Sequence, residues 1–365
     1  MRIKAWLVAV LATTIFAQNF IASDEAWVWS SAVQYKKGKT DSITFAKLAQ
    51  IEAGSPVVLS QMPRAESSLL RLGYFSKNSD AKLYRIANRN RIVPAFDLTD
   101  ATANFAEASI AWDAETGDLD GLARVQLMNI AGTARDFSFG GENAQNYRSA
   151  EMSYKEPFIF GLNGSLKLHG EFLEYDSTRQ RNADLKYIQK LSWEWQYSVG
   201  GGYKNEKAYS SLSLSYDSRD KLPLTFKGLF TEAQAEFSKF VAAGLSGEYY
   251  QPVSKNWTLL LASKGFKSDD LFFIGGRSDF IGFPPRSIRV KSYALSEMDF
   301  QWHGLKNSAL HIFGQNGIYD WERVLTYGLG WEQGISNASI AIYYALLHGL
   351  KPMDGLLNIS VKILY

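Results

Sequence analysis

Cysteine is absent from this 365-residue chain, and histidine occurs only four times. The lack of cysteine excludes a disulfide framework and fits a compartment where a free thiol would be a liability. The net charge of +2 gives no sign of a nucleic-acid partner. Beyond the N-terminal region, no apolar run approaches the roughly 20 residues that a membrane-spanning helix needs. Aromatic residues are abundant instead, with 22 Phe, 19 Tyr and 10 Trp, and these favour strands and membrane interfaces.

The N-terminus has the pattern of an export signal. Residues 1–4 carry two positive charges, and residues 5–17 are apolar except for two threonines. This run is too short to cross a bilayer as a helix. A buried first helix is the alternative, but a basic start followed by an early apolar block favours export. We therefore predict that residues 1–22 form a signal peptide.

Residues 28–100 mix helical and extended patterns. Apolar residues recur at spacings of three and four between Ser60, the expected cap, and Gly73, the expected stop. A shorter helical pattern covers residues 42–50. Extended patterns cover residues 32–35, 82–86 and 92–98. The region is therefore predicted to be a small α+β module with the order strand, helix, helix, strand, strand.

Residues 101–365 repeat with a period of two. In residues 325–332, for example, leucine, tyrosine and tryptophan alternate with threonine, glycine and glutamate. Such alternation is typical of a strand with one face in lipid and one face in a lumen. The length of the region fits about 16 strands, with 14 as the alternative.

A soluble β-sandwich would alternate in the same way. The export signal and the aromatic residues near segment ends favour a barrel instead. Closure leaves no sheet edge in lipid, so the last strand must pair with the first. We predict a mainly β protein, with a transmembrane antiparallel β-barrel in the bacterial outer membrane that is preceded by the α+β module in the periplasm.

Enzyme motifs and cofactor motifs are missing from the chain. The sequence has no Gly-x-Ser-x-Gly elbow, no metal-spaced histidine pair and no phosphate-binding loop. His169 and His303 fall in the polar phase of their segments and are predicted to face the lumen. The glycines at 200–202 are predicted to form a turn or bend. We therefore expect no catalytic residue, no metal and no cofactor.

Two segments near the N-terminus resemble one family. Residues 48–75 resemble a POTRA module, a small periplasmic domain. Residues 104–135, with an Asn-x-x-Gly turn at 129–132, are similar to the first barrel hairpin of the bacterial surface antigen family. This superfamily of outer-membrane assembly and translocation proteins combines POTRA modules with a barrel and includes BamA- and TamA-like members. The resemblance implies a short member with one POTRA-like module.

A third segment, residues 211–228, is similar to the family's Asp-x-Arg-Asp segment. The pattern occupies Asp217, Arg219 and Asp220 and is followed by a proline and a glycine. Only a forced interpretation would make these residues catalytic. We interpret them as a structural ion-pair cluster at a strand end.

A fourth segment, residues 272–286, resembles the family's loop that folds back into the barrel lumen. The positions of this motif are Gly275, Gly276, Phe280, Ile281, Gly282 and Phe283. In the family an arginine stands at the position of Ile281 and is held by acids on the inner wall. The wall positions here are Glu297 and Gln315, so one acid is replaced by an amide. An acid buried without its cation is costly, and we expect packing to hold the loop instead.

The resemblance implies a factor that inserts β-barrel proteins into the outer membrane or moves a substrate across it. Its partners would be outer-membrane lipid, unfolded or extended protein substrates and accessory assembly proteins. The module would receive an extended segment by strand addition, and the barrel seam would open laterally. Tyr365, an aromatic C-terminus, is the predicted assembly signal. The alternative is a passive channel or structural barrel that has lost assembly activity, which the loss of the loop arginine favours.

Overall fold

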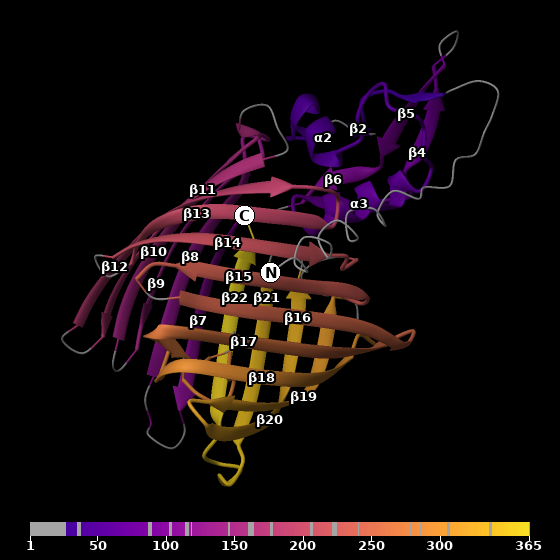
Figure 1. Ribbon diagram of the computed structural model, residues 1–365. Helices are drawn as coiled ribbons and strands as arrows, with labels where there is room; N and C mark the ends of the chain where they lie inside the picture. The colour runs from indigo at the N-terminus through magenta and orange to yellow at the C-terminus, as the bar shows by residue number, and fades with distance from the viewer. Residues whose placement is uncertain are drawn as a thin grey trace, which may run out of the picture.

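The computed structural model in Figure 1 describes residues 27–364 with short gaps. The gaps are residues 35–37, 87–89, 102–103, 114–116, 118, 145–146, 160–163, 176–177, 205–206, 221–224, 240, 277–278, 285, 305–306 and 336–337. The predicted signal peptide, residues 1–22, and the predicted assembly signal, Tyr365, lie outside the described residues. The chain forms a small mixed part, coloured indigo and purple, and a large barrel of strands.

In the small mixed part, which we call the N-terminal module, the described residues form six short strands. They are β1 (Val28–Trp29), β2 (Val33–Gln34), β3 (Phe75–Lys77), β4 (Lys82–Arg85), β5 (Arg91–Phe96) and β6 (Leu98–Asp100). β5 is central, because it pairs in parallel with β1 and β2 and antiparallel with β4. β3 and β6 form a separate antiparallel pair. The predicted order is observed, although β1 and β3 were not predicted and the predicted last strand is divided into β5 and β6.

Helices α2 (Ser42–Ala49) and α3 (Gln61–Arg71) follow the two predicted helical patterns. Asp41 caps α2, because its carboxylate accepts hydrogen bonds from the N–H groups of Ile43 at 2.9 Å and Thr44 at 3.3 Å. A hydrogen bond from the Thr44 hydroxyl lowers the pKa of the Asp41 carboxyl. The stabilisation that the cap provides is therefore complete at any pH above the ordinary carboxyl pKa. It is lost only as the pH falls through the lowered pKa of Asp41.

The prediction for α3 is wrong at its N-terminus, where Ser60 was expected to be the cap, and right at its C-terminus, where Gly73 was expected to be the stop. Ser60 precedes the helix, but its side chain makes no capping hydrogen bond and its backbone is already helical. Gly73 follows the helix with a φ angle of 73°, which is the left-handed conformation expected of a stop. Among the residues that the structure describes, no helix is long and apolar enough to cross a bilayer.

The hydrophobic core of the N-terminal module extends into the barrel. Trp29, Phe45 and Phe96 are at most 1% exposed and form its centre. Barrel residues that join or pack against the same cluster are Met128, Ala134, Phe158 and Trp193. Because apolar burial contributes about 25 cal/mol per Å², this shared core holds the module against the barrel.

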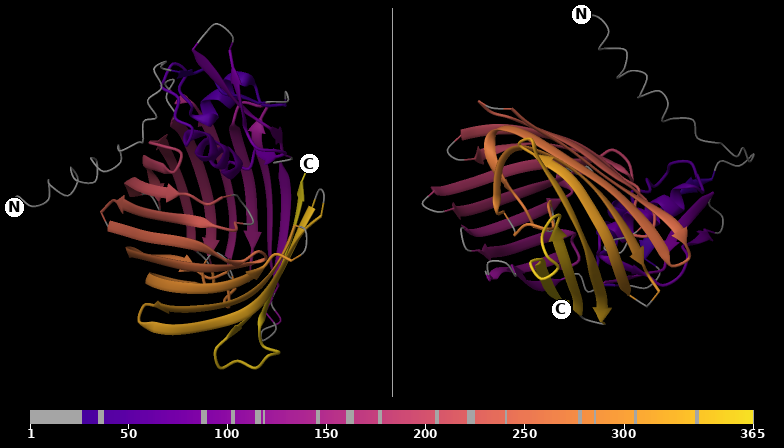
Figure 2. Two further views of the ribbon diagram at one scale, coloured as in Figure 1. Left: turned by 90° about the vertical axis from the view of Figure 1, so that its right-hand side faces the viewer. Right: turned by 90° about the horizontal axis from the view of Figure 1, so that it is seen from below.

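Sixteen strands form a closed antiparallel barrel, in which β22 returns to pair with β7. The strand number is therefore 16 and not 14. The strands are β7 (Phe105–Asp113), β8 (Leu119–Ile130), β9 (Arg135–Asn143), β10 (Tyr147–Pro157), β11 (Gly164–Tyr175), β12 (Thr178–Lys190), β13 (Trp195–Lys204), β14 (Lys207–Asp217), β15 (Gly228–Phe237), β16 (Val241–Ser254), β17 (Trp257–Ile274), β18 (Ile288–Trp302), β19 (Ser308–Tyr319), β20 (Glu322–Ile335), β21 (Ala338–Leu347) and β22 (Leu356–Leu364). Figure 2 shows the indigo module beside the ends of the purple strands, with the yellow strands farther away.

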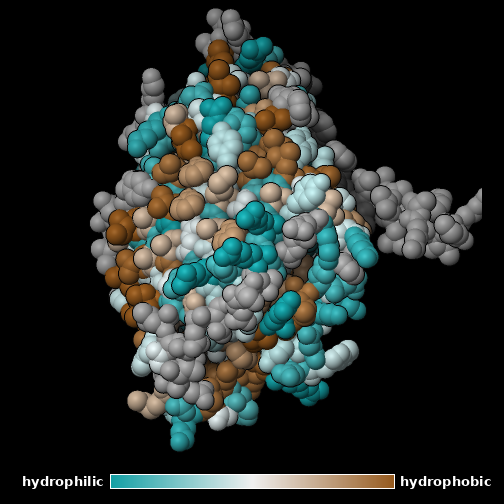
Figure 3. Space-filling model, turned by 90° about the vertical axis from the view of Figure 1, so that its left-hand side faces the viewer, coloured by the Kyte–Doolittle hydropathy of each residue, from teal (hydrophilic) through white to brown (hydrophobic). Residues whose placement is uncertain are grey.

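The two faces of the barrel wall differ in the way that the alternation predicts. On β20, Leu325, Tyr327 and Leu329 are 44%, 44% and 61% exposed, whereas Thr326 between them is fully buried. Apolar residues thus point outward and smaller or polar residues point inward. Figure 3 shows hydrophobic residues along the left margin of one face and hydrophilic residues across its middle.

The glycines at 200–202 do not form the predicted turn. They lie inside β13. A Cβ atom at Gly202 would lie 2.1 Å from the carbonyl oxygen of Ala183, and one at Gly200 would lie 2.7 Å from that of Leu185. Glycine is therefore needed here because β12 comes too close for a side chain.

Candidate functional site

The connection between β17 and β18, residues 275–287, folds back into the barrel, and we call it the lumen loop. Gly275 and Gly276 begin it with φ angles of 119° and 84°, in a region that favours glycine. The N–H of Gly276 donates to the carbonyl of Phe283 at 3.0 Å. A Cβ atom at Gly275 would lie 2.4 Å from the carbonyl oxygen of Pro284. The two glycines thus permit the tight turn that directs the loop inward.

Aromatic side chains hold the tip of the lumen loop. Phe280 is fully buried, and its ring centroid lies 5.9 Å from that of Tyr293 and 6.0 Å from that of Tyr319. Phe283 meets Tyr319 edge to face at 6.1 Å. Gly317 makes room for Phe280, since a Cβ atom there would lie 2.3 Å from the ring. Aromatic pairs of this kind contribute about 0.5–1.5 kcal/mol each beyond their buried area.

Ile281, at the position of the family's arginine, is buried against Phe313 and Tyr343. Its backbone N–H donates to Gln315 Oε1 at 3.0 Å. Gln315 Nε2 in turn donates to Glu297 Oε2 at 2.7 Å. Glu297 and Gln315 are direct neighbours on β18 and β19. The structure therefore brings together the loop position and both wall positions that were singled out in the sequence.

Both polar atoms of the Gln315 amide make two hydrogen bonds each. Its Oε1 atom also accepts a hydrogen bond from the Thr326 hydroxyl at 3.2 Å, and its Nε2 atom also donates to the Asp279 carbonyl at 3.2 Å. Gly282 lies against the same threonine, because a Cβ atom at Gly282 would be 2.4 Å from Thr326 Cγ2. A buried amide with all its partners satisfied specifies one loop position without a charge.

Two charged anchors of the lumen loop were missed in the sequence. Arg286 Nη2 lies 2.9 Å from Glu171 Oε1 on β11, and its guanidinium lies 5.8 Å from the ring centroid of Tyr147. Lys264 Nζ on β17 lies 2.6 Å from Asp279 Oδ1. The only sequence signal for the first pair is an arginine in the loop motif and a glutamate in the polar phase of a strand. Their pairing depends on barrel closure.

These contacts make the lumen loop a strap across the barrel interior. One end is tied to β17 through Asp279, and the other is tied to β11 through Arg286. β11 and β17 are separated by five strands along the shorter way around the wall. The strap thus links two distant parts of the barrel wall.

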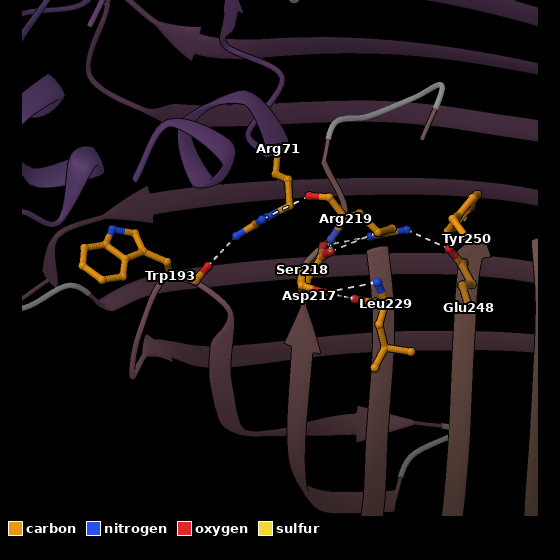
Figure 4. Close-up of polar contacts among 8 residues, drawn as sticks. All are labelled: Arg71, Trp193, Asp217, Ser218, Arg219, Leu229, Glu248 and Tyr250. Atoms are coloured by element: carbon orange, nitrogen blue, oxygen red, sulfur yellow. Dashed lines mark hydrogen bonds and ion pairs between the residues drawn. The ribbon is translucent and has the colours of Figure 1, made fainter. Parts of the chain in front are cut away.

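The cluster of Asp217, Arg219 and Asp220 lies at the end of β14. Arg219 donates to Asp217 through Nε at 3.0 Å and Nη2 at 2.9 Å, and to Glu248 on β16 at 2.8 Å. Asp220 accepts a hydrogen bond from the N–H of Phe226 at 3.0 Å. Figure 4 shows Arg219 between β14 and β16. These contacts link the end of β14 to the described residues that precede β15.

The same strand end contacts the N-terminal module. Arg71, the last residue of α3, donates to the carbonyl of Arg219 at 3.1 Å and to that of Trp193 at 2.6 Å, as Figure 4 shows. Trp193 Nε1 donates back to the carbonyl of Ala49 at 3.0 Å. Tyr74 and Asp136 form a further contact between the hydroxyl and the carboxylate at 2.7 Å. The module thus docks on residues that directly follow β12 and β14.

β7 and β22 form the seam where the ends of the barrel meet. They pair over nine residues, with Ser109 directly opposite Ser360. The Ser360 hydroxyl donates to Glu107 Oε1 at 2.9 Å, and Lys362 Nζ lies 3.4 Å from the ring centroid of Phe105. The seam is therefore closed by a full ladder and by side chains on the inner face.

The histidines do not gather into a site. His169 lies on the inner face of β11, and His303 follows β18, with its ring 5.7 Å from that of Phe226. His311 Nδ1 lies 2.8 Å from Asp299 Oδ2 on the inner wall. Over the described ranges, no group of three or more His, Asp or Glu residues is arranged to hold a metal ion.

Comparison with known proteins gives a fold and no sequence family. No family model and no curated protein matches the chain. BamA from Haemophilus ducreyi lacking POTRA domains 1–3 aligns with a TM-score of 0.56 at 12% identity, over 92% of this chain and 84% of that one. This chain has the fold of that barrel.

The barrel of CdiB is similar as well. CdiB from Acinetobacter baumannii aligns with a TM-score of 0.62 at 13% identity, over 93% of this chain and 74% of that one. CdiB from Escherichia coli gives 0.59 at 13% identity, over 93% and 76%. At these identities the similarity concerns the architecture, and the likeness of individual motifs remains an inference from the sequence.

Proposed function

We propose that this chain is an outer-membrane barrel protein that inserts other β-barrel proteins into that membrane or moves a polypeptide across it. The main support is the contact of Ile281 with Gln315 and, through it, with Glu297, because the family resemblance selected these positions. The fold shared with the BamA and CdiB barrels adds to it. Neither activity requires enzyme chemistry.

We infer the location from the apolar outer face of the barrel and from its even number of strands. An apolar outer face suits lipid, and an even number of strands leaves both chain ends on the same side of the membrane. That side is the periplasm in outer-membrane barrels with short periplasmic turns. We expect the protein to fractionate with outer membranes and to migrate faster on unboiled gels, because a closed barrel resists detergent. Recovery as a soluble periplasmic protein would contradict this location.

The N-terminal module is proposed to act as a POTRA-like receptor for extended segments. Over the described residues, β4 pairs with β5 alone and is an edge strand. All four of its residues are exposed, and Leu83 and Tyr84 are each 43% exposed. An exposed edge of this kind can accept an unfolded protein segment by main-chain hydrogen bonding.

The seam is proposed to pass the segment into the membrane. Opening β7 from β22 would expose two strand edges, each able to template a new strand. The lumen loop would then act as an internal support that keeps the opened wall in shape. Accessory assembly proteins would contact the module at its free surfaces.

A passive channel or structural barrel is the second candidate. Ile281 favours it, because the cation that characterises the loop in the family is replaced by an apolar side chain. A passive channel would conduct ions in planar bilayers, and shortening the lumen loop would increase the conductance. It would have no effect on the abundance of other barrel proteins.

Depletion of the protein separates the two candidates. Cells depleted of it would be compared with undepleted cells by quantitative proteomics of the outer membrane. An assembly factor predicts the selective loss of a set of barrel proteins before growth slows. An unchanged set of barrel proteins, together with a conductance that rises when the lumen loop is shortened, would contradict the proposed function and support the channel.

A further inference from the structure

A cavity of about 350 Å³ lies where the N-terminal module meets the inner wall of the barrel. One side comes from the end of α2, with Leu48 among the lining residues, and Phe158, which follows β10, lines it as well. Its walls come from the inward-facing side chains of β9–β13. The cavity is therefore at the end of the barrel that carries the module, and none of its lining residues belongs to the lumen loop, β7 or β22.

The cavity is strongly cationic. Four lysines line it, and Asp136 is the only carboxylate among the lining residues. The lysines are Lys47, Lys155, Lys167 and Lys190. Asp136 is already engaged, because it accepts hydrogen bonds from the Tyr74 hydroxyl at 2.7 Å and the Asn129 N–H at 3.0 Å and lies 3.4 Å from Lys155. Its single negative charge cannot balance four lysines.

Like charges are placed directly opposite each other on this wall. Lys155 of β10 is the cross-strand neighbour of Lys167 of β11, which is in turn the neighbour of Lys186 of β12. Directly opposed like charges destabilise a sheet. Lys186 is relieved in part by Asp184 at 3.8 Å, and Lys155 by the aspartate described above. An anion beside Lys167 would relieve the repulsion that remains along this row.

Two of the lysines have no acidic partner. Over the part of the chain that the structure describes, the side chains of Lys167 and Lys190 form no ion pair and no hydrogen bond. Lys47 lies over the ring of Phe158, another lining residue, at 5.0 Å to the centroid. Lys167 and Lys190 can therefore donate to a ligand without breaking an ion pair or a hydrogen bond of the described residues.

A smaller cavity of about 190 Å³ continues from the first and shares Lys167 and Gln196 with it. Its lining includes Ser211, whose buried hydroxyl has no hydrogen-bond partner within the described residues. It also includes Glu232 and Glu236, of which the second lies 3.6 Å from Lys204. These carboxylates disfavour an anion in the smaller cavity and place it in the larger one.

We propose that the larger cavity binds a phosphate group. Lysine side chains that line one cavity, two of them without an ion pair among the described residues, match the charge and the acceptor oxygens of phosphate. The phosphate can come from free inorganic phosphate or from the headgroup of a phospholipid, whose acyl chains would contact Leu48 and Phe158. This site goes beyond the proposed function and does not depend on it.

The test is calorimetric titration of the full-length protein in an uncharged detergent at constant ionic strength. Inorganic phosphate and dihexanoyl phosphatidic acid are titrated separately. Saturable binding of phosphate alone assigns the site to the free ion, and tighter binding of the lipid assigns it to a headgroup. Lys167→Gln and Lys190→Gln should each weaken binding about tenfold, because each removes a charged hydrogen-bond donor. Lys204→Gln, an inner-wall lysine outside the cavity, should leave binding unchanged.

A stability measurement keeps the proposal testable if one variant folds poorly. Lys167→Gln removes the repulsion along the row, so it should raise the heat-modifiability midpoint in phosphate-free buffer and abolish the further rise that phosphate gives the wild type. Absence of saturable binding up to about 10 mM of either probe would overturn the proposal. So would equal binding by the lysine variants and the wild type, or binding of hexaglutamate without binding of phosphate, which would assign the cavity to acidic polypeptide.

Discussion

Gln315 shows how an uncharged side chain can fix a loop inside a barrel. Its oxygen accepts from the Ile281 N–H, and its nitrogen donates to Glu297. An acid at this position would bring a second carboxylate to hydrogen-bond distance of Glu297, at a considerable cost in a buried setting. The apolar residue at 281 and the amide at 315 are therefore consistent with each other.

This arrangement predicts coupling between the two positions. Ile281→Arg alone should lower the temperature at which half of the protein loses its heat-modifiable form. The packing of Ile281 is lost, and the new cation faces only Glu297. Gln315→Asp alone should lower this temperature through repulsion by the same glutamate. The double variant should be more stable than the sum of the single effects by about 0.5–3 kcal/mol, because the new charges compensate each other. Strict additivity in this double-mutant cycle would mean that the two new side chains do not meet.

Arg286 is the second residue on which the lumen loop depends. Arg286→Gln should leave Glu171 without its cation and cost about 1–3 kcal/mol of stability. The loop should then leave the β11 wall, and the single-channel conductance in planar bilayers should rise. Arg289→Gln, on β18 beside the loop, is the matched control and should leave both quantities unchanged. Equal conductance of the Arg286 variant and the wild type would argue against the strap.

The sequence allowed some of these residues to be predicted and not others. Ile281, Glu297 and Gln315 could be selected because they lie in a motif and in alternating strands. The pair of Arg286 and Glu171 could not, because it forms only when β11 and the β17–β18 connection face each other across a closed barrel. Local patterns contain no information about such a distance.

At the scale of elements, α3 ties the module to the barrel. Arg71 donates to two backbone carbonyls, so Arg71→Ala should weaken docking by roughly 1.5–3 kcal/mol. Arg64→Ala is the control, because Arg64 is 55% exposed and lies 3.6 Å from Glu194, a contact worth about 0–1 kcal/mol. Hydrogen exchange at residues 191–194 should accelerate in the first variant only. Equal exchange in both would mean that Arg71 does not contribute to docking.

The last strand carries a prediction of its own. Leu364 is the final paired residue of β22, opposite Phe105 of β7, and Tyr365 is the predicted assembly signal. Deletion of residues 364–365 should reduce the yield of heat-modifiable barrel several-fold, because closure and recognition by the assembly machinery are both impaired. Tyr365→Phe keeps the aromatic end and should assemble normally. An unchanged yield after the deletion would count against the signal.

Helices and strands were predicted well where a periodic pattern extends over many residues. Features that depend on the backbone conformation of a few residues were predicted poorly. The two helices were found from their spacing. The glycines at 200–202 were misread as a turn, because glycine inside a strand and glycine in a turn look alike in sequence. Ser60 was misread as a cap, since its backbone conformation decides whether its side chain can reach an N–H.

At the scale of the whole molecule, alternation predicted the class of fold and the approximate number of strands. It did not predict where the module docks. The junction is built from short connections: Ala134 gives no periodic signal, and Trp193 continues the alternation of β13 although it precedes that strand. The cationic row of Lys155 and Lys167 was also invisible, because cross-strand register is set by the assembled barrel.

The central claim is that the seam between β7 and β22 opens during function. Because the chain has no cysteine, a single engineered disulfide can close it. Ser109 and Ser360 are directly opposite across the seam, and cross-strand Cα distances of about 4.5–5.5 Å suit a disulfide. Ser198 and Ser213, opposite each other on β13 and β14, provide a matched control.

The most direct test is to express Ser109→Cys/Ser360→Cys in cells depleted of the wild type and to measure the abundance of outer-membrane barrel proteins. Under oxidising conditions the seam disulfide should reproduce the depletion defect, and a reductant should reverse it. The Ser198→Cys/Ser213→Cys disulfide should have no effect. Full abundance of barrel proteins with a completely formed seam disulfide would contradict lateral opening and leave a passive barrel as the better account.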